Sequence, residues 1–216
     1  MRTRRVNLVT SHDELLGELR KRFYVHKKLF SAEECDRIIE HYKTQTYVNA
    51  SVADLNESEG NKIVAVTDED ARKGRIVFCD HKNPVTNFAF QKLFYSVLWA
   101  NFGWSVFPLR FLQIAEYNSE TDGGFYKRHR DIINCQNPQR IISSVTQLSK
   151  KEDYTGCNLI FDDDSNAPVD FLEQGDTIFF TSIEPHEVTP VITGTRYSLT
   201  AWYEGPVLWE TLPEDF

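Results

Sequence analysis

From residue 106 onwards, apolar and polar positions alternate in short runs that are separated by turn residues. Such alternation is typical of β-strands, because successive side chains point to opposite faces of a sheet. Eight short strands of this kind favour a double-sheet jelly roll. The predicted strands span residues 107–117, 124–131, 140–148, 157–161, 169–172, 177–181, 187–191 and 196–203.

The first hundred residues carry a different pattern, in which apolar positions recur at helical spacing. Ser31 and Glu34 form a capping box that predicts the start of one helix, and a similar signal occurs at Ser11. Pro84 predicts the start of a strongly apolar helix that ends near Asn101. The predicted fold is α+β and mainly β, with N-terminal supporting helices beside the jelly roll. We expect a single domain over 1–216, with a helical flank at about 1–104 and a core at about 105–205. Further strands are predicted at 23–26, 46–52, 62–66 and 75–79, with a polar, turn-rich loop at 56–60.

Composition fits one globular domain, since 41% of the 216 residues are hydrophobic and 13% are aromatic. No apolar run of about 18 residues is present and no apolar segment follows the first residues, so we expect no membrane span and no secretory signal. The four cysteines lack CxxC spacing and are typical of free thiols in a reducing compartment. These features together predict a cytoplasmic protein.

The net charge of −8 is unevenly distributed. Residues 1–28 hold eight Lys or Arg against three Asp or Glu, which leaves the remainder of the chain at −13. We interpret this basic flank as solvated. An acidic body argues against generic nucleic-acid binding, which depends on neutralising phosphates.

His129 and Asp131 are separated by two positions, which puts both side chains on one face of a strand. An imidazole nitrogen and a carboxylate oxygen can therefore reach one cation, and a third ligand has to come from elsewhere. His186, which lies 57 positions after His129, is the best candidate. Two histidines and one carboxylate form the facial triad of non-haem Fe(II) oxygenases, which leaves coordination positions open for a co-substrate and O₂.

Arg196 and Ser198 again share one strand face, ten and twelve positions after His186. A guanidinium group binds a carboxylate bidentately, so this pair can hold the far carboxylate of a small diacid. Arg196 has apolar neighbours, and an unpaired buried arginine is costly, which favours a ligand for it. Tyr117 can add a phenol donor.

These motifs resemble the 2-oxoglutarate- and Fe(II)-dependent dioxygenases, and specifically their prolyl 4-hydroxylase-like branch. The similarity covers about 105–205 in order, and is weaker over 30–104. It is carried by Tyr117, the run 126–131, Gln147-Leu148, Gly175-Asp176, the run 186–190 and the run 195–203.

The resemblance implies a double-stranded β-helix core that holds iron through His129, Asp131 and His186. It implies 2-oxoglutarate as co-substrate, O₂ as oxidant and ascorbate as the usual reductant, with Arg196 on the distal carboxylate. It also places Tyr117, Gln147 and Ser198 near the co-substrate, and Tyr126, Arg140 and Trp202 on the substrate side.

The chain departs from the family pattern at Gly156-Cys157, where relatives often have two glycines. It also has Arg196 where many collagen-type members have lysine, and its loop 118–124 is longer than in some relatives. These differences affect the prediction of the substrate's identity more than the prediction of the iron ligands.

The leading hypothesis is hydroxylation of a prolyl residue in a peptide or protein. An alternative is a hydroxylase of a free amino acid or small metabolite. A nucleic-acid demethylase is disfavoured, because that class usually has an arginine six residues after the co-substrate arginine, where this chain has Trp202. A non-catalytic jelly-roll binding module is disfavoured because it has no need of an intact triad with Arg196.

Overall fold

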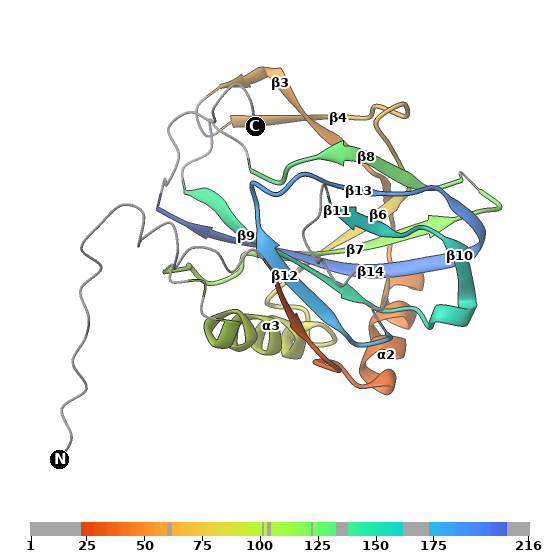
Figure 1. The fold of residues 1–216 in the computed structure, drawn as a ribbon, viewed down its shortest axis with the longest axis horizontal. Helices are drawn as coiled ribbons and strands as arrows, with labels where there is room; N and C mark the ends of the chain where they lie inside the picture. Colours follow the sequence, from red (N-terminus) through yellow and green to blue (C-terminus); the bar gives the residue numbers. More distant parts are fainter. Residues whose placement is uncertain are drawn as a thin grey trace.

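The computed structural model describes residues 23–59, 62–100, 102, 105–121, 123–132, 138–161 and 173–206 (Figure 1). Within these ranges the helices are α2 (Ala32–Lys43) and α3 (Asn87–Ala100), with a 3₁₀ turn at Lys151–Asp153. The strands are β1 (Phe23–His26), β2 (Val48–Asn49), β3 (Val52–Glu59), β4 (Lys62–Val66), β5 (Arg72–Lys73), β6 (Arg75–Asp80), β7 (Phe111–Asn118), β8 (Phe125–His129), β9 (Gln139–Gln147), β10 (Tyr154–Gly156), β11 (Leu159–Phe161), β12 (Thr177–Thr181), β13 (His186–Val188) and β14 (Val191–Gly205).

Two antiparallel sheets lie face to face (Figure 1). The larger has eight strands, in the order β1-β12-β9-β14-β7-β6-β2, with β10 pairing with β14. The smaller has four strands in the order β11-β13-β8-β5, and β3 with β4 forms a separate two-stranded sheet. The predicted mainly β, double-sheet architecture with supporting helices is confirmed. The prediction of one domain over 1–216 stays a prediction.

Strand β14 shows how the sequence divides the large sheet into two faces. Leu199, Ala201 and Tyr203 belong to the core cluster on the helix side of the sheet. Arg196 and Ser198 alternate with them and line the cavity between the two sheets. Because side chains alternate along a strand, the apolar set fixes the register that presents the polar set to the cavity.

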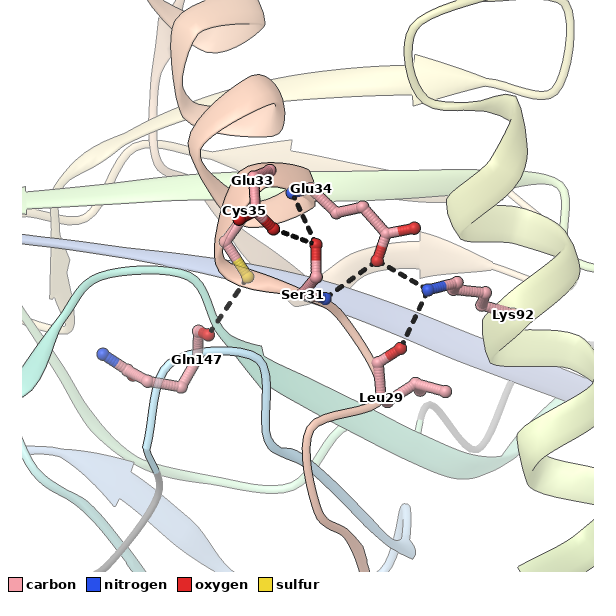
Figure 2. A network of polar contacts seen from close by, with 7 residues as sticks. All are labelled: Leu29, Ser31, Glu33, Glu34, Cys35, Lys92 and Gln147. Carbon is pink, nitrogen blue, oxygen red and sulfur yellow. Dashed lines mark hydrogen bonds and ion pairs between the residues drawn. The ribbon is translucent and has the colours of Figure 1, made fainter.

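Helix α2 begins where the sequence predicted. The Ser31 side chain accepts a hydrogen bond from the Glu34 backbone N–H, and the Glu34 carboxylate accepts one from the Ser31 N–H (Figure 2). The Lys92 ammonium from α3 bonds to Glu34 and to the Leu29 carbonyl, which links both helices to the segment after β1 (Figure 2). The buried face of α2, through Cys35 and other apolar residues, packs on the core cluster of the large sheet.

Several boundaries differ from the predictions. Helix α3 begins at Asn87, because the Asn83 side chain accepts a hydrogen bond from the Val85 N–H and holds the Pro84 region in a turn. The predicted loop at 56–60 is wrong for 56–59, which extend β3 along β4 across a register shift between Asp54 and Glu59. Strand β10 was not predicted, and the signal at Ser11 and the run 169–172 lie outside the described residues.

Among the helices of the described part of the chain, none combines the length and the apolar character that a membrane crossing demands.

Candidate active site

Two histidines and one aspartate lie together on the four-stranded sheet. Antiparallel pairing of β8 with β13 places His129 opposite His186, and Asp131 follows just after the end of β8. The His129 Nε2 atom lies 3.6 Å from one Asp131 carboxylate oxygen, and the His186 Nε2 atom lies 3.8 Å from the other. The three side chains offer ligand atoms that all lie within 4.8 Å of one another. The structure therefore gathers the predicted trio into a cluster with the dimensions of a single-ion site.

Backbone carbonyls fix the orientation of both imidazole rings. His129 Nδ1 lies 2.9 Å from the Lys127 carbonyl oxygen, and His186 Nδ1 lies 2.9 Å from the Glu184 carbonyl oxygen. A carbonyl oxygen only accepts, so each Nδ1 carries the hydrogen and each Nε2 keeps its lone pair. Both Nε2 atoms are thus prepared for a metal, in the way that outer hydrogen bonds orient ligating histidines.

Burial and neighbouring groups favour the protonation states that a metal needs. Burial is the main reason that the pKa of His186 falls to about 4, which leaves this ring neutral at pH 7. Burial alone raises the pKa of Asp131, but His186, His129 and a hydrogen bond from Ser143 outweigh it and hold that pKa below its usual range. The donor set of two imidazoles and one carboxylate fits Fe(II) in a facial triad.

The four residues predicted to bind the co-substrate meet on the facing large sheet. Arg196 is opposite Tyr117 on β7, and Ser198 is opposite Gln147 on β9. The Arg196 guanidinium lies 6.0 Å from the centre of the Tyr117 ring. Arg196, Tyr117 and Ser198 line the cavity, so a small diacid between them and the trio can reach both sheets.

Gln147 has a different position from the other three. Its Oε1 atom accepts a hydrogen bond of 3.0 Å from Arg196 Nε, while its Nε2 donates to the Ser149 carbonyl and to the Tyr154 hydroxyl, both at 3.0 Å. Gln147 is not among the cavity-lining residues. The amide therefore orients the Arg196 side chain from behind.

Two backbone features support this side of the cavity. A Cβ atom on Gly124 would lie 2.9 Å from the Cα and Cβ atoms of Tyr117, so only glycine lets the two strands approach this closely. Cys157 has a φ of 52°, a left-handed conformation that glycine adopts more readily than a residue with a Cβ atom. Burial raises the pKa of the Cys157 thiol, against the opposing effect of its contact with Arg196.

The predicted substrate residues lie around the trio in the same cavity, which has a volume of about 760 Å³. The Tyr126 ring stacks on the His129 ring with their centroids 3.5 Å apart. The Arg140 guanidinium lies 4.4 Å from the centre of the Trp202 ring. Burial raises the pKa of Tyr126 to about 12, so its phenol stays a hydrogen-bond donor at neutral pH. Their roles toward a substrate stay predictions.

Sequence reasoning missed several polar residues of the cavity, among them Arg72 and Gln113. Arg72 comes from β5, which pairs with β8, and its guanidinium lies 4.4 Å from the centre of the Tyr126 ring. It donates hydrogen bonds to Gln113 Oε1 at 2.7 Å and to the Ser51 carbonyl at 3.2 Å. Gln113 could have been found, because it precedes Tyr117 by four positions on one strand and must share its face.

Comparison with known proteins agrees with this geometry. Residues 112–204 match the model of the 2OG-Fe(II) oxygenase superfamily. The chain is 31% identical over 105 residues to a PKHD-type hydroxylase of Stenotrophomonas maltophilia, which covers 46% of each chain. It is 30% identical over 90 residues to a PKHD-type hydroxylase of Idiomarina loihiensis, covering 42% of this chain and 41% of the relative. The chain thus spans less than half the length of these curated relatives.

Solved structures share the fold over most of the chain. A prolyl-4-hydroxylase of Pseudomonas putida gives a TM-score of 0.65 at 18% identity, covering 89% of this chain and all of that one. A prolyl hydroxylase of Trichoplax adhaerens, in complex with a peptide fragment of the hypoxia inducible factor oxygen degradation domain, gives a TM-score of 0.63 at 17% identity. The match covers 91% of this chain and 94% of that one. A viral collagen prolyl hydroxylase of Paramecium Bursaria Chlorella virus-1 gives a TM-score of 0.60 at 16% identity, covering 86% of this chain and 97% of that one.

Proposed function

We propose that this protein, whose residues 112–204 belong to the 2OG-Fe(II) oxygenase superfamily and are prolyl hydroxylase-like, is a dioxygenase that hydroxylates a C–H bond. Its substrate in this proposal is a prolyl residue of a peptide or protein. The observation that carries the proposal is the cluster of His129, Asp131 and His186 in a cavity whose facing wall holds Arg196.

In this proposal His129, Asp131 and His186 hold Fe(II). When bound, the iron supplies oxidative chemistry, in which O₂ and 2-oxoglutarate are converted while one oxygen atom enters the substrate. The protein positions the groups around it, since the Nδ1–H bonds of both histidines keep their Nε2 atoms directed at the ion. Ascorbate as reductant stays a prediction from the family resemblance.

Arg196 is proposed to bind the distal carboxylate of 2-oxoglutarate, with Tyr117 and Ser198 beside it. The side chain of Arg196 is 2% exposed, so its charge needs a partner inside the cavity. Gln147 holds the guanidinium through Nε, which leaves its terminal nitrogens for a bidentate contact with the carboxylate.

The shape of the cavity favours a peptide over a free amino acid. A volume of about 760 Å³ is far more than one proline occupies. An aromatic row leads outward from the site, with Trp202 next to Phe111 and Phe111 next to Phe78, at centroid distances of 6.0 and 5.4 Å. Phe78 is 53% exposed, so residues that flank a bound proline have an apolar surface to contact.

The test measures succinate formation with Fe(II), 2-oxoglutarate and O₂ across Pro-containing peptides, free amino acids and methylated oligonucleotides. Mass spectrometry then locates the added oxygen. We expect prolyl peptides to gain one oxygen atom and free proline to react poorly. The variant His186→Ala should form no succinate and hydroxylate neither substrate. Oxygen found only on free amino acids, or only on nucleobases, would contradict the peptide substrate. No succinate with any of them would contradict the dioxygenase itself. A cytoplasmic location stays a prediction.

A further inference from the structure

The wall of the active-site cavity is strongly cationic, although the chain carries a net charge of −8. Asp131 is the single acidic residue among the described residues that line the cavity. In the proposed function this carboxylate holds the metal, and Arg196 is neutralised by 2-oxoglutarate. Arg72, Lys127, Arg130 and Arg140 then remain as cationic side chains on the substrate side, and no second carboxylate lines the cavity within the described residues. The lining residues with a positive charge are Arg72, Lys127, Arg128, Arg130, Arg140 and Arg196.

Two donor groups on this side are buried without an acceptor. The Arg72 Nε atom and the Trp202 Nε1 atom have no hydrogen-bond partner in the described structure. A buried donor without a partner costs roughly 1–3 kcal/mol, and a bound group with oxygen acceptors removes that cost once the side chain turns its donor toward the cavity that both residues line. Both atoms only donate, so the group they favour carries carbonyl or carboxylate oxygens.

Arg140 makes no ion pair with a carboxylate among the described residues, although Asp131 and Glu204 attract it through space. Its guanidinium is stacked on the Trp202 ring at 4.4 Å, and no hydrogen bond or ion pair of its side chain is found within the described residues. The nearby Glu204 carboxylate is engaged by Arg110 at 3.0 Å. A stacked guanidinium of this kind keeps its edge free to bind a planar carboxylate.

Lys127 and Arg128 extend the positive surface to the exterior. Both are exposed on β8, next to His129. Exposed charges near a site act mainly on the encounter with a charged partner and on specificity. The positive charge therefore continues from the buried arginines to the mouth of the cavity.

We propose that the substrate is an acidic peptide segment, with an Asp or Glu side chain close to the hydroxylated residue. This inference rests on the proposed function and narrows its substrate class. Charge complementarity favours a polyanion in general, but the aromatic row from Trp202 to Phe78 also requires apolar flanking residues. A peptide can supply both carboxylates and apolar side chains at alternate positions.

The test uses a set of peptides with one central proline and a single Glu, Gln or Lys at each of the three positions on either side. Glu and Gln have nearly the same shape, so their ratio isolates the charge. We expect kcat/KM for the best Glu peptide to exceed that of its Gln counterpart by about tenfold, the size of one charge-assisted bond. The ratio should shrink at high salt.

The variant Lys127→Glu with Arg128→Glu should reverse the preference toward the Lys peptide. Lys151→Glu is the matched control, because Lys151 is exposed but does not line the cavity, and it should keep the wild-type preference. The preference is a ratio within each variant, so a change in total activity does not affect it. Equal turnover of Glu, Gln and Lys peptides would overturn the acidic substrate while leaving the hydroxylase intact. Turnover of oligonucleotides in place of every peptide would overturn both.

Discussion

His129 and His186 are cross-strand partners on β8 and β13, with ring centroids 4.2 Å apart. The antiparallel ladder therefore sets their separation, while Asp131 completes the cluster from just beyond the end of β8. A local motif and a distant residue become one site through a single strand pairing.

Removing one member of this pair should abolish tight iron binding. For His186→Ala we expect less than one tenth of the wild-type iron content, because two remaining ligands form a weak site. Iron content after anaerobic loading and gel filtration measures this. His81→Ala is the control, since His81 is exposed and outside the cluster. Full iron occupancy in His186→Ala would show that the ligand assignment is wrong.

Metal binding should also stabilise the folded chain. A ligand that binds only the native state adds about 2.7 kcal/mol at a hundredfold excess over its Kd. We therefore expect Fe(II), or Mn(II) as an oxygen-stable substitute, to raise the melting temperature of the wild type and a chelator to reverse the rise. A similar rise in His129→Ala would place the bound metal elsewhere.

The co-substrate should depend on Arg196. In Arg196→Ala the loss of a charge-assisted contact worth roughly 1.5–3 kcal/mol should raise the KM for 2-oxoglutarate about ten- to a hundredfold. Iron content should stay near the wild-type value, because Arg196 lies on the opposite sheet from the trio. Succinate assays at varied 2-oxoglutarate measure the effect, and an unchanged KM would reject this role.

Two adjacent glycines allow steric and backbone effects to be separated. Gly124→Ala puts a methyl group 2.9 Å from the Tyr117 backbone, so we expect lower stability by about 1–3 kcal/mol and weaker 2-oxoglutarate binding. Gly123→Ala meets no atom within 4 Å but has a φ of 61°, so it should cost about 1–2 kcal/mol of stability alone. Denaturant unfolding and co-substrate titration distinguish the two, and equal co-substrate affinities would contradict the role of the close approach.

A buried carboxylate should matter more than the lysine that it binds. Asp176 is 1% exposed and accepts bonds from the Lys28 and Glu173 backbone N–H groups as well as from Lys27, whose side chain is 62% exposed. Asp176→Ala leaves two backbone N–H donors without their acceptor and removes a buried side chain, so it should cost about 1–3 kcal/mol, whereas Lys27→Met should cost less than 1. Chemical denaturation measures both, and equal losses would refute the asymmetry.

The sequence was most informative where chemistry and strand periodicity coincide. His129 with Asp131, and Arg196 with Ser198, were readable as pairs because a two-residue spacing already fixes a common face. Strand β12 was predicted with its observed bounds, Thr177–Thr181, because it is a short apolar run after a glycine turn.

The rest depended on contacts between distant segments. Arg72 reaches the cavity only because β5 pairs with β8, more than 50 residues later, and no local pattern indicates that pairing. Strand β10 is three residues long, too short to show alternation. Gln147 was expected beside the co-substrate, but its position behind Arg196 depends on a hydrogen bond to that residue, 49 positions later in the chain.

The strand order has a consequence for synthesis of the protein. β14, the last strand within the described residues, lies between β9 and β7 in the large sheet, and β1 pairs with β12. A nascent chain therefore cannot complete this sheet until residue 205 has left the ribosome, and until then the edges of β9 and β7 that β14 covers have no partner strand. This fifteen-residue strand joins the two parts of the sheet, so the co-substrate wall forms only after the residues of β14 have been synthesised.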